Sequence, residues 1–455
     1  MNALEQLAGA IAGCEARGER VRETIEMHLV DTVGAWIAST RTAEGLALLR
    51  FRAAMPVGRR AGDDPALDLA TRCALARLSE IDDIHLASMV TPSAIVVPGA
   101  LTLAQTIPAA TADDVRGAIL AGTEAMTRLG RAIDGPAILY RGVWPTYFVA
   151  PFGIAAAAAR LLRLDERATA NALVLALTLA APGVGHHNTA TTARWLALGH
   201  AARNGLAAAL AARQGFTSDR NLVEGQFLPG VYGMTPDLAA LTDGLGERVA
   251  LTEVSFKPWC AARQTMAATQ ALKEIIEAGV APATMREITV SVLPPHLKMI
   301  DHGVVAGDRA SHLTSVQYCM AVAALAPELA FDLQQAPSQL PPAVRSFMAR
   351  IKVEADEGLL ADYPQSWPAR VRVAAAGSAQ HERIVTHVPG DPARAFDRTR
   401  VHEKFLRFAE PVLGPEGAER MLARCRAALA TGEFTPLVEE IEQTCSDALA
   451  RAAGR

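Results

Sequence analysis

A change in hydrophobic periodicity after Leu251 constrains the fold of this chain most. From Met1 to about Leu251, apolar residues recur at three- and four-residue spacing, alanine is abundant, and proline or glycine marks the breaks, a pattern typical of consecutive α-helices. After Lys257 short segments alternate apolar and polar residues, as strands do. From Arg400 onward the helical spacing returns. The sequence therefore predicts a mainly α protein with one strand-containing region.

The boundaries of these patterns predict two domains. We expect residues 1–252 and 398–455 to form a large all-helical domain built from the N- and C-terminal segments, and residues 253–397 to form a smaller α+β domain. Expected helices are Ile25–Thr40, Pro151–Leu162, Arg194–Gln214, Ala261–Ala278, Ser315–Leu325, Phe405–Leu413 and Ala418–Ala430. Expected strands are Glu287–Val292, Ala349–Glu354, Ala369–Ala375 and Glu382–His387. A further helix is expected after Thr91-Pro92, which has the form of an N-cap followed by proline.

Composition excludes several classes of protein. The 44 Lys and Arg residues nearly balance 48 Asp and Glu residues, so no global attraction to nucleic acid or to an anionic membrane is expected. Charged residues interrupt every apolar run before about 18 apolar residues accumulate, which predicts no membrane-spanning helix. The N-terminus has no secretory pattern and the six cysteines have no CxxC spacing, so we expect a cytoplasmic protein without disulfides or a zinc site.

Motifs for common nucleotide and metal chemistry are missing from the sequence. We find no Walker loop, no GxGxxG after a strand, no HExxH and no GxSxG. His186 and His187 are adjacent, so both rings cannot point from one helix face to a shared metal ion. We predict no metal site, and four polar segments remain as candidates for chemistry.

The first polar segment is Glu80–His85, in which three carboxylates and a histidine crowd six residues. One interpretation is a solvated loop. The alternative is that Asp83 or His85 faces a cleft and transfers protons, because a carboxylate and an imidazole tune each other's pKa towards neutrality.

The second segment places Lys257 between Phe256 and Trp259, just before a helix whose first turns carry Arg263 and Gln264. A desolvated lysine near a helix N-terminus and an arginine could act as a base or hold a carboxylate. The alternative is a lysine whose aliphatic stem lies along the aromatic rings.

The third and fourth segments lie at expected helix starts. Ser315 has the form of an N-cap, and Tyr318 after it is either a buried hydroxyl bonded to the backbone or a donor aimed into a pocket. Arg194, at the start of a long helix, offers a fork of donors that suits a carboxylate, although arginines also form structural ion pairs at domain boundaries.

Eight segments in this order resemble the MmgE/PrpD family of 2-methylcitrate dehydratase, cis-aconitate decarboxylase and iminodisuccinate epimerase. They are LVDTVGAWIA, TPSAIVVPGAL, GVWPTYFVAPFGIAAAAARLL, ARWLALGHAARNGLAAALAARQGF, FKPWCAARQ, DRASHLTSVQYCMAVAAL, WPARVRV and VPGDPARAFDRTRVHEKFLRFA. The resemblance implies a helical domain made from both ends of the chain, an α+β lid, a homodimer, and chemistry without a metal or an organic cofactor.

The resemblance also allows the family's functional positions to be carried over one by one. Four positions match the family pattern: Asp83, His85, Lys257 and Tyr318. Five depart from it: Glu80, Ile84 and Thr91 replace an aspartate, a threonine and a histidine, Trp144 replaces a second histidine, and Arg194 replaces a lysine. These changes remove two imidazoles and leave positive charge, so carboxylate binding is expected to survive while the usual proton-transfer set does not.

We therefore predict a cofactor-independent lyase or isomerase that abstracts a proton alpha to a carboxylate of a small di- or tricarboxylate. The alternatives are a cis-aconitate-type decarboxylase and a non-catalytic carboxylate-binding protein. The predicted catalytic residues are Lys257, Tyr318, Asp83 and His85. The predicted substrate-binding residues are Arg194, Arg263, Gln264, Thr91 and Trp144.

Overall fold

A computed structural model describes residues 1–55, 64–107, 109–180 and 191–454 of the chain. The described residues divide into two compact units. Unit 1 holds those before Ser255 and those after Phe396, and unit 2 holds Ser255–Phe396. Unit 1 therefore combines both ends of the chain.

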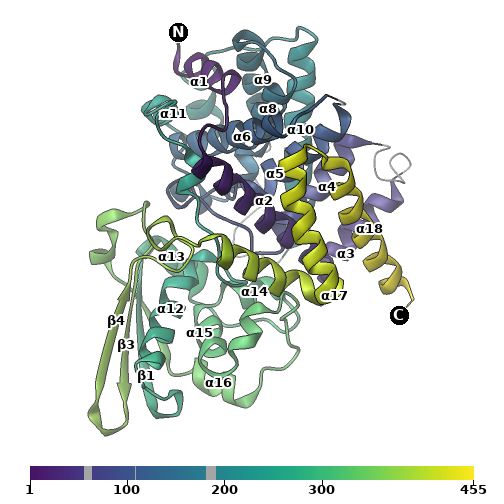
Figure 1. Cartoon of the computed structure of the whole chain (residues 1–455). Coiled ribbons are helices and arrows are strands. Elements are labelled where there is room, and N and C mark those ends of the chain that lie inside the picture. Colours follow the sequence, from purple (N-terminus) through teal and green to yellow (C-terminus); the bar gives the residue numbers. More distant parts are fainter. Residues whose placement is uncertain (56–63, 108, 181–190, 455) are drawn as a thin grey trace. The chain divides into compact units, whose positions relative to one another are not determined.

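Unit 1 is built from helices (Figure 1). They are α1 (Ala3–Ala12), α2 (Glu19–Ser39), α3 (Ala43–Ala54), α4 (Pro65–Leu78), α5 (Ser93–Thr106), α6 (Ala112–Ala132), α7 (Gly135–Leu139), α8 (Pro145–Leu161), α9 (Glu166–Thr178), α10 (Ala193–Arg213), α11 (Ala239–Thr242), α17 (Arg398–Thr431) and α18 (Phe434–Ala453). Short turns of other helix types are η1 (Leu86–Ser88), η2 (Leu228–Tyr232) and η3 (Ala250–Glu253). The C-terminal α17 packs on α2.

Helix α8 lies in the core of unit 1, where it packs against α5, α6, α9 and α10. Its alanine run from Ala155 to Ala159 is fully buried. Close approach depends on glycine: a Cβ added to Gly205 of α10 would lie 2.2 Å from the Pro151 carbonyl oxygen of α8. The small side chains therefore let the helix backbones pack closely around α8.

Unit 2 contains a four-stranded sheet in the order β2-β1-β3-β4. The strands are β1 (Met285–Val292), β2 (Ile351–Ala355), β3 (Ala369–Ala375) and β4 (Gln380–Val385), with β1 and β2 parallel and the other pairs antiparallel. Helix α12 (Arg263–Glu277) packs on β3 and β4. The other helical segments are α13 (Pro294–Ile300), α14 (Arg309–Thr314), α15 (Val316–Leu325), α16 (Pro342–Met348), η4 (Pro282–Thr284), η5 (Pro327–Phe331), η6 (Glu357–Asp362), η7 (Ala376–Ser378) and η8 (Pro392–Arg394).

The structure confirms the predicted fold class, a mainly α protein with a smaller α+β part, and it corrects details. Helix α8 begins at Pro145 rather than Pro151, because proline is well tolerated in a first turn. The two helices expected on either side of Gly414 are confirmed, because the backbone leaves helical geometry at Gly414, with a φ of 71°, within the range labelled α17. The expected N-cap role of Thr91 is wrong: α5 begins at Ser93, and the cap position belongs to Pro92.

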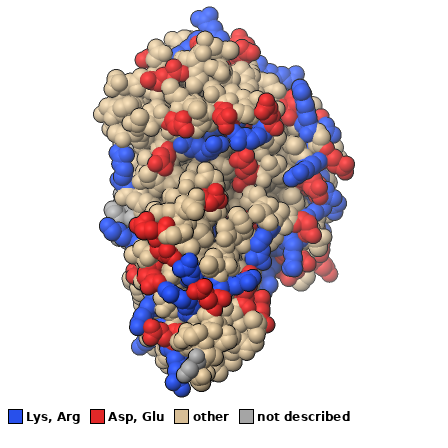
Figure 2. Space-filling view, turned by 90° about the vertical axis from the view of Figure 1, so that its left-hand side faces the viewer, with Lys and Arg blue, Asp and Glu red and all other residues tan. Residues whose placement is uncertain are grey.

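Charged side chains of both signs lie next to one another over the face shown in Figure 2, as the nearly balanced composition leads one to expect. In the part of the chain that the structure describes, none of the helices combines the length and the apolar character needed to cross a bilayer.

Candidate active site

Asp83 lies between α4 and η1 in a buried network of unit 1. One carboxylate oxygen, Oδ2, is 2.8 Å from Nδ1 of His28, and the other, Oδ1, accepts the Ser93 amide at 3.2 Å. The Ser93 hydroxyl is 3.2 Å from the same His28 nitrogen. Both oxygens of Asp83 therefore bond within the fold, where they join α2 to the start of α5.

A second buried ion pair holds the same segment to the C-terminal helix. Nζ of Lys404 on α17 lies 2.6 Å from Oδ1 of Asp31 on α2, and it donates to the Ile81 carbonyl at 2.7 Å. Burial raises the pKa of Asp31, and the charge of Lys404 opposes this effect. The C-terminal part of the chain thus fixes the backbone two residues before Asp83.

His85 belongs to a smaller group that reaches solvent. Its backbone amide donates to the Val90 carbonyl, and its carbonyl accepts the Val90 amide. These two hydrogen bonds close the turn around η1. Nδ1 lies 2.8 Å from the Ser88 hydroxyl, and Nε2 lies 3.4 Å from Oε2 of Glu253. The imidazole is buried, whereas the Glu253 side chain is 41% exposed. The result is a histidine–carboxylate pair with one partner accessible to water.

Glu253 is a residue that the sequence did not indicate. It lies in η3, far from His85 along the chain, and no local motif marks it. The hydrogen bond from His85 holds the pKa of Glu253 below its usual value, because that bond favours the ionised carboxylate. Together with the imidazole, this carboxylate can pass a proton between solvent and the buried side of the pair.

Arg194 lies in the first turn of α10 and stacks on aromatic rings. Its guanidinium carbon is 4.3 Å from the centre of the Trp195 ring and 5.6 Å from that of Trp144. Its Nε is buried and has no hydrogen-bond partner among the described residues. The stacked guanidinium thus keeps a donor available for a planar anion such as a carboxylate.

Thr91 bonds to the first turn of α8, which follows Trp144. The Thr91 amide donates to the Thr146 hydroxyl at 3.0 Å, and the two hydroxyl groups are 3.2 Å apart. Trp144 holds the cap position of α8 and stacks on Tyr147, with 5.5 Å between ring centres. The segment that carries His85 is therefore fastened to the turn that carries Trp144.

Arg77 at the end of α4 connects the segment Glu80–Asp82 to α10. Its Nη1 lies 3.0 Å from Oε1 of Glu80 and 3.2 Å from Oδ1 of Asp82, and its guanidinium carbon is 5.9 Å from the centre of the Trp195 ring. Unit 1 thus brings together residues from α4, α8 and α10. We call Arg77, Trp144, Tyr147, Arg194 and Trp195 the Arg194 cluster.

Lys257 lies in unit 2 and is buried, as are its sequence neighbours Phe256 and Trp259. The Phe256 amide donates to the Gly390 carbonyl at 2.9 Å. Gly390 has a φ of 97°, and a Cβ there would lie 2.3 Å from the Phe256 carbonyl oxygen, so only glycine fits at this approach. The backbone before Lys257 is therefore held by a close crossing of two chain segments.

Arg263 and Gln264 begin α12, as predicted, and both are buried. Nη2 of Arg263 lies 2.6 Å from Oδ2 of Asp391, which also accepts the Val388 amide at 2.8 Å. Nε and Nη1 of Arg263 have no hydrogen-bond partner among the described residues. Arg263 thus forms an internal ion pair, and substrate binding by Arg263 and Gln264 stays a prediction.

Tyr318 lies in the first turn of α15, and the predicted N-cap is confirmed: the Ser315 hydroxyl accepts the Tyr318 amide at 3.3 Å. The phenol ring meets His312 edge to face, with 4.8 Å between ring centres. Burial raises the pKa of Tyr318 to about 12. The phenol is therefore protonated at neutral pH and can act as a donor.

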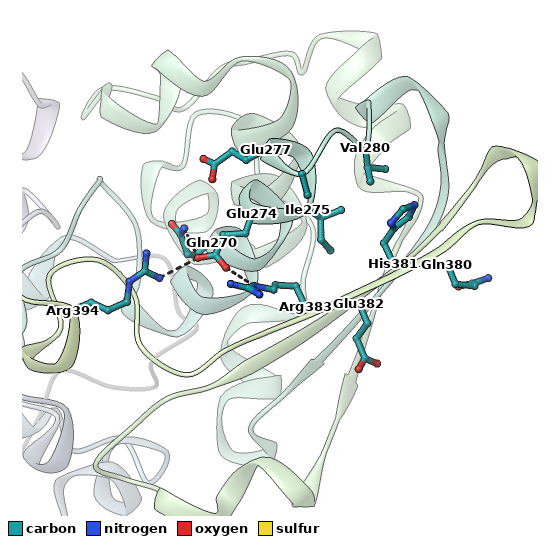
Figure 3. A pocket seen from close by; sticks show the side chains of 11 residues that line it. Gln270, Glu274, Ile275, Glu277, Val280, Gln380, His381, Glu382, Arg383 and Arg394 are labelled. Carbon is teal, nitrogen blue, oxygen red and sulfur yellow. Dashed lines mark hydrogen bonds and ion pairs between the residues drawn. The ribbon is translucent and has the colours of Figure 1, made fainter.

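A groove with a volume of about 710 Å³ lies in unit 2 between α12 and β4 (Figure 3). At its base Glu274 accepts hydrogen bonds from Arg383 at 2.5 Å and from Arg394 at 3.1 Å. Burial would raise the pKa of Glu274, but these bonds and one from Gln270 hold it below its usual value. A second cavity, of about 300 Å³ in unit 1, is lined in part by Cys14 and Glu124. None of the predicted site residues lines either cavity.

The predicted residues separate by unit. Asp83, His85, Thr91, Trp144 and Arg194 lie in unit 1, and Lys257, Arg263, Gln264 and Tyr318 lie in unit 2. His186 and His187 fall outside the described residues. Across the described ranges no group of three or more His, Cys, Asp or Glu side chains is arranged to hold a metal ion.

Comparison with protein families gives two matches. A model of the MmgE/PrpD N-terminal domain matches residues 5–236, and a model of the MmgE/PrpD C-terminal domain matches residues 259–428. The two matches together cover most of the chain. A search among curated proteins found no match.

Proposed function

Because the chain belongs to the MmgE/PrpD family, we propose that it is a lyase or isomerase acting on a small di- or tricarboxylate. Dehydratases, other lyases and epimerases are the activities of this family. The reaction we propose begins with abstraction of a proton alpha to a carboxylate. That step needs a base, a proton donor, and positive groups that stabilise the enolate-like charge.

The pair formed by His85 and Glu253 is the observation that carries this proposal. The buried imidazole is oriented by Ser88 on one side, and its other nitrogen faces the half-exposed carboxylate at 3.4 Å. A histidine held in this way can exchange a proton with the carboxylate and, through it, with water. In this account His85 is one of two candidates, with Tyr318, for returning the proton to the substrate carbon. Asp83 positions His28 and Ser93, because its oxygens already bond to them.

The remaining roles follow from the charge and the protonation of each group. Arg194 supplies the cation for one substrate carboxylate, since its stacked guanidinium keeps Nε unpartnered among the described residues. We assign Lys257 as the base or the electrostatic stabiliser. Tyr318 is a suitable proton donor, because burial keeps its phenol protonated. The homodimer implied by the family resemblance belongs to the same proposal, and light scattering checks it.

Hydrogen exchange in D2O tests the proposed reaction whatever product it forms. The full chain is incubated with citrate, cis-aconitate and iminodisuccinate, and proton NMR follows deuterium at the alpha carbons. We expect deuterium to enter at least one acid, with loss of this exchange in Lys257→Ala. Lys298→Ala, which removes an exposed lysine of the same unit, serves as the matched control and keeps the exchange.

Two other outcomes would contradict the proposal in distinguishable ways. Release of CO2 without deuterium exchange into the substrate would favour a decarboxylase. Tight binding of an acid with no exchange and no product would favour a carboxylate-binding protein without catalytic activity.

A further inference from the structure

The Arg194 cluster contains a hydroxyl group that the fold does not use. Tyr147 lies in the first turns of α8 and is only 2% exposed. Its hydroxyl is buried and has no hydrogen-bond partner within the described ranges. Buried tyrosine hydroxyls normally find a partner, since an unmatched polar group in the interior is unfavourable. The hydroxyl therefore has capacity for a partner beyond the described residues.

Aromatic rings and charges of both signs surround this hydroxyl. The Tyr147 ring stacks on Trp144 at 5.5 Å between centres, and Arg194 lies over the same indole at 5.6 Å. Burial raises the pKa of the phenol to about 12; the charges of Arg77 and Arg194 oppose this rise, and those of Glu80 and Asp82 add to it. The hydroxyl thus stays protonated at neutral pH and can donate a hydrogen bond to an anion.

The charges of the two arginines differ in how far they are compensated. Arg77 pairs with Glu80 and Asp82 through Nη1, so its charge is neutralised within the chain. Arg194 stacks on the two indoles, and its Nε has no partner among the residues described. Arg194 offers a charged donor and the Tyr147 hydroxyl offers a neutral one. Together they match a single carboxylate, whose two oxygens can each accept one hydrogen bond.

We propose that Tyr147 is a substrate-binding residue, whose hydroxyl and the Nε of Arg194 donate to one carboxylate of the substrate. This assignment rests on the proposed function and adds a residue to it. Trp144 and Arg194 are partly exposed, so a ligand from solvent can reach the cluster on their side. Trp144 then provides the wall of the subsite, where it orients both the phenol and the guanidinium.

The experiment compares Tyr147→Phe with Tyr232→Phe in the full chain. Both substitutions delete one hydroxyl in unit 1, and the Tyr232 ring packs edge to face on Phe148 at 5.1 Å, outside the Arg194 cluster. The probes are succinate, citrate and cis-aconitate, and isothermal titration calorimetry measures their dissociation constants. We expect about tenfold weaker binding of the tightest probe by Tyr147→Phe, in line with loss of one hydrogen bond to a charged group, and unchanged binding by Tyr232→Phe.

Thermal unfolding of the ligand-free proteins separates binding from a merely structural role. A hydroxyl that bonds only to ligand adds nothing to the empty fold, so Tyr147→Phe should unfold at the same temperature as the wild type or higher. Lower thermal stability with unchanged affinity would overturn the assignment, as would unchanged affinity alone or a wild-type protein that binds none of the three acids. If affinity falls as expected but no deuterium exchange occurs, the subsite stands and the proposed reaction fails.

Discussion

Two groups of buried polar residues in unit 1 differ in how completely the chain satisfies them. Around Asp83, the carboxylate, His28 and Ser93 bond to one another at 2.8 to 3.2 Å. In the Arg194 cluster, Tyr147 Oη and Arg194 Nε are buried and lack partners among the described residues. The first group has used its hydrogen-bonding capacity to join helices. The second still has capacity for a ligand.

This difference separates fold-stabilising residues from ligand-binding residues. A polar group that is satisfied inside the fold stabilises it, and its removal leaves its partners buried and unmatched. A polar group left unmatched makes the empty fold less stable than it could be, which is reasonable where a ligand supplies the partner. Substitution should therefore change stability in the first group and ligand affinity in the second.

The largest effect is expected for Asp83→Ala. The change leaves Nδ1 of His28 and the amide of Ser93 without their acceptors in a buried site, so the free energy of unfolding should fall by about 3 kcal/mol. Urea denaturation followed by circular dichroism measures this loss.

Asp113→Ala is the matched control for that substitution. Asp113 is 68% exposed and pairs with Arg116 on the surface of α6, so the free energy of unfolding should change by less than about 0.5 kcal/mol. Asp83→Ala with wild-type stability but no activity would break the comparison, because it would assign Asp83 to catalysis instead.

Helix and strand positions could be predicted because periodicity in the sequence reports directly on burial. Strand β3 matches its predicted range, Ala369–Ala375, since alternate residues face the core. The predicted start of α8 failed because Pro151 has the form of a helix start, yet the helix accommodates it six residues after Pro145. Thr91 shows the same limit: its hydroxyl bonds to Thr146 on another element, which local sequence does not reveal.

The same comparison applies to two buried histidines, and here the expected difference in protein stability grows as the pH falls. His28 bonds to Asp83, whereas the Nε2 of His296 in unit 2 has no partner among the described residues. Burial lowers the pKa of His296 from 6.5 to about 3, with Arg263 acting in the same direction. The unfolded chain therefore binds this proton below about pH 6.5 while the folded protein does not, so stability is lost as the pH falls towards 3.

The substitution His296→Gln removes this contribution. Between pH 6 and pH 4.5 the wild type should lose about 1.4 kcal/mol more per pH unit than the variant. Urea denaturation at several pH values measures both slopes. Equal slopes would contradict a neutral, buried His296.

A smaller effect is expected for Arg194→Lys. An ammonium keeps the positive charge but cannot reproduce the planar fork or the stacking on Trp195 at 4.3 Å. The affinity for the tightest-binding carboxylate should therefore fall about tenfold, with little change in thermal stability. Calorimetric titration checks the affinity, and an unchanged dissociation constant would remove Arg194 from the binding site.

The site could be predicted only in part, because the informative property is the partner of each side chain. Asp83 and His85 stand two residues apart in one polar segment, yet one is fully bonded in a buried network and the other faces Glu253. In the sequence, nothing distinguishes Tyr147 from the apolar residues around it in α8. Glu253 and Tyr147 become recognisable only when residues distant in the chain are brought together.

A crystal structure of the full chain soaked with citrate tests the central claim most directly. We predict one carboxylate of citrate within about 2.7 to 3.2 Å of both Arg194 Nε and Tyr147 Oη, with the hydrogen bonds of Asp83 unchanged. Citrate bound elsewhere, with these two donors still unoccupied, would contradict the account.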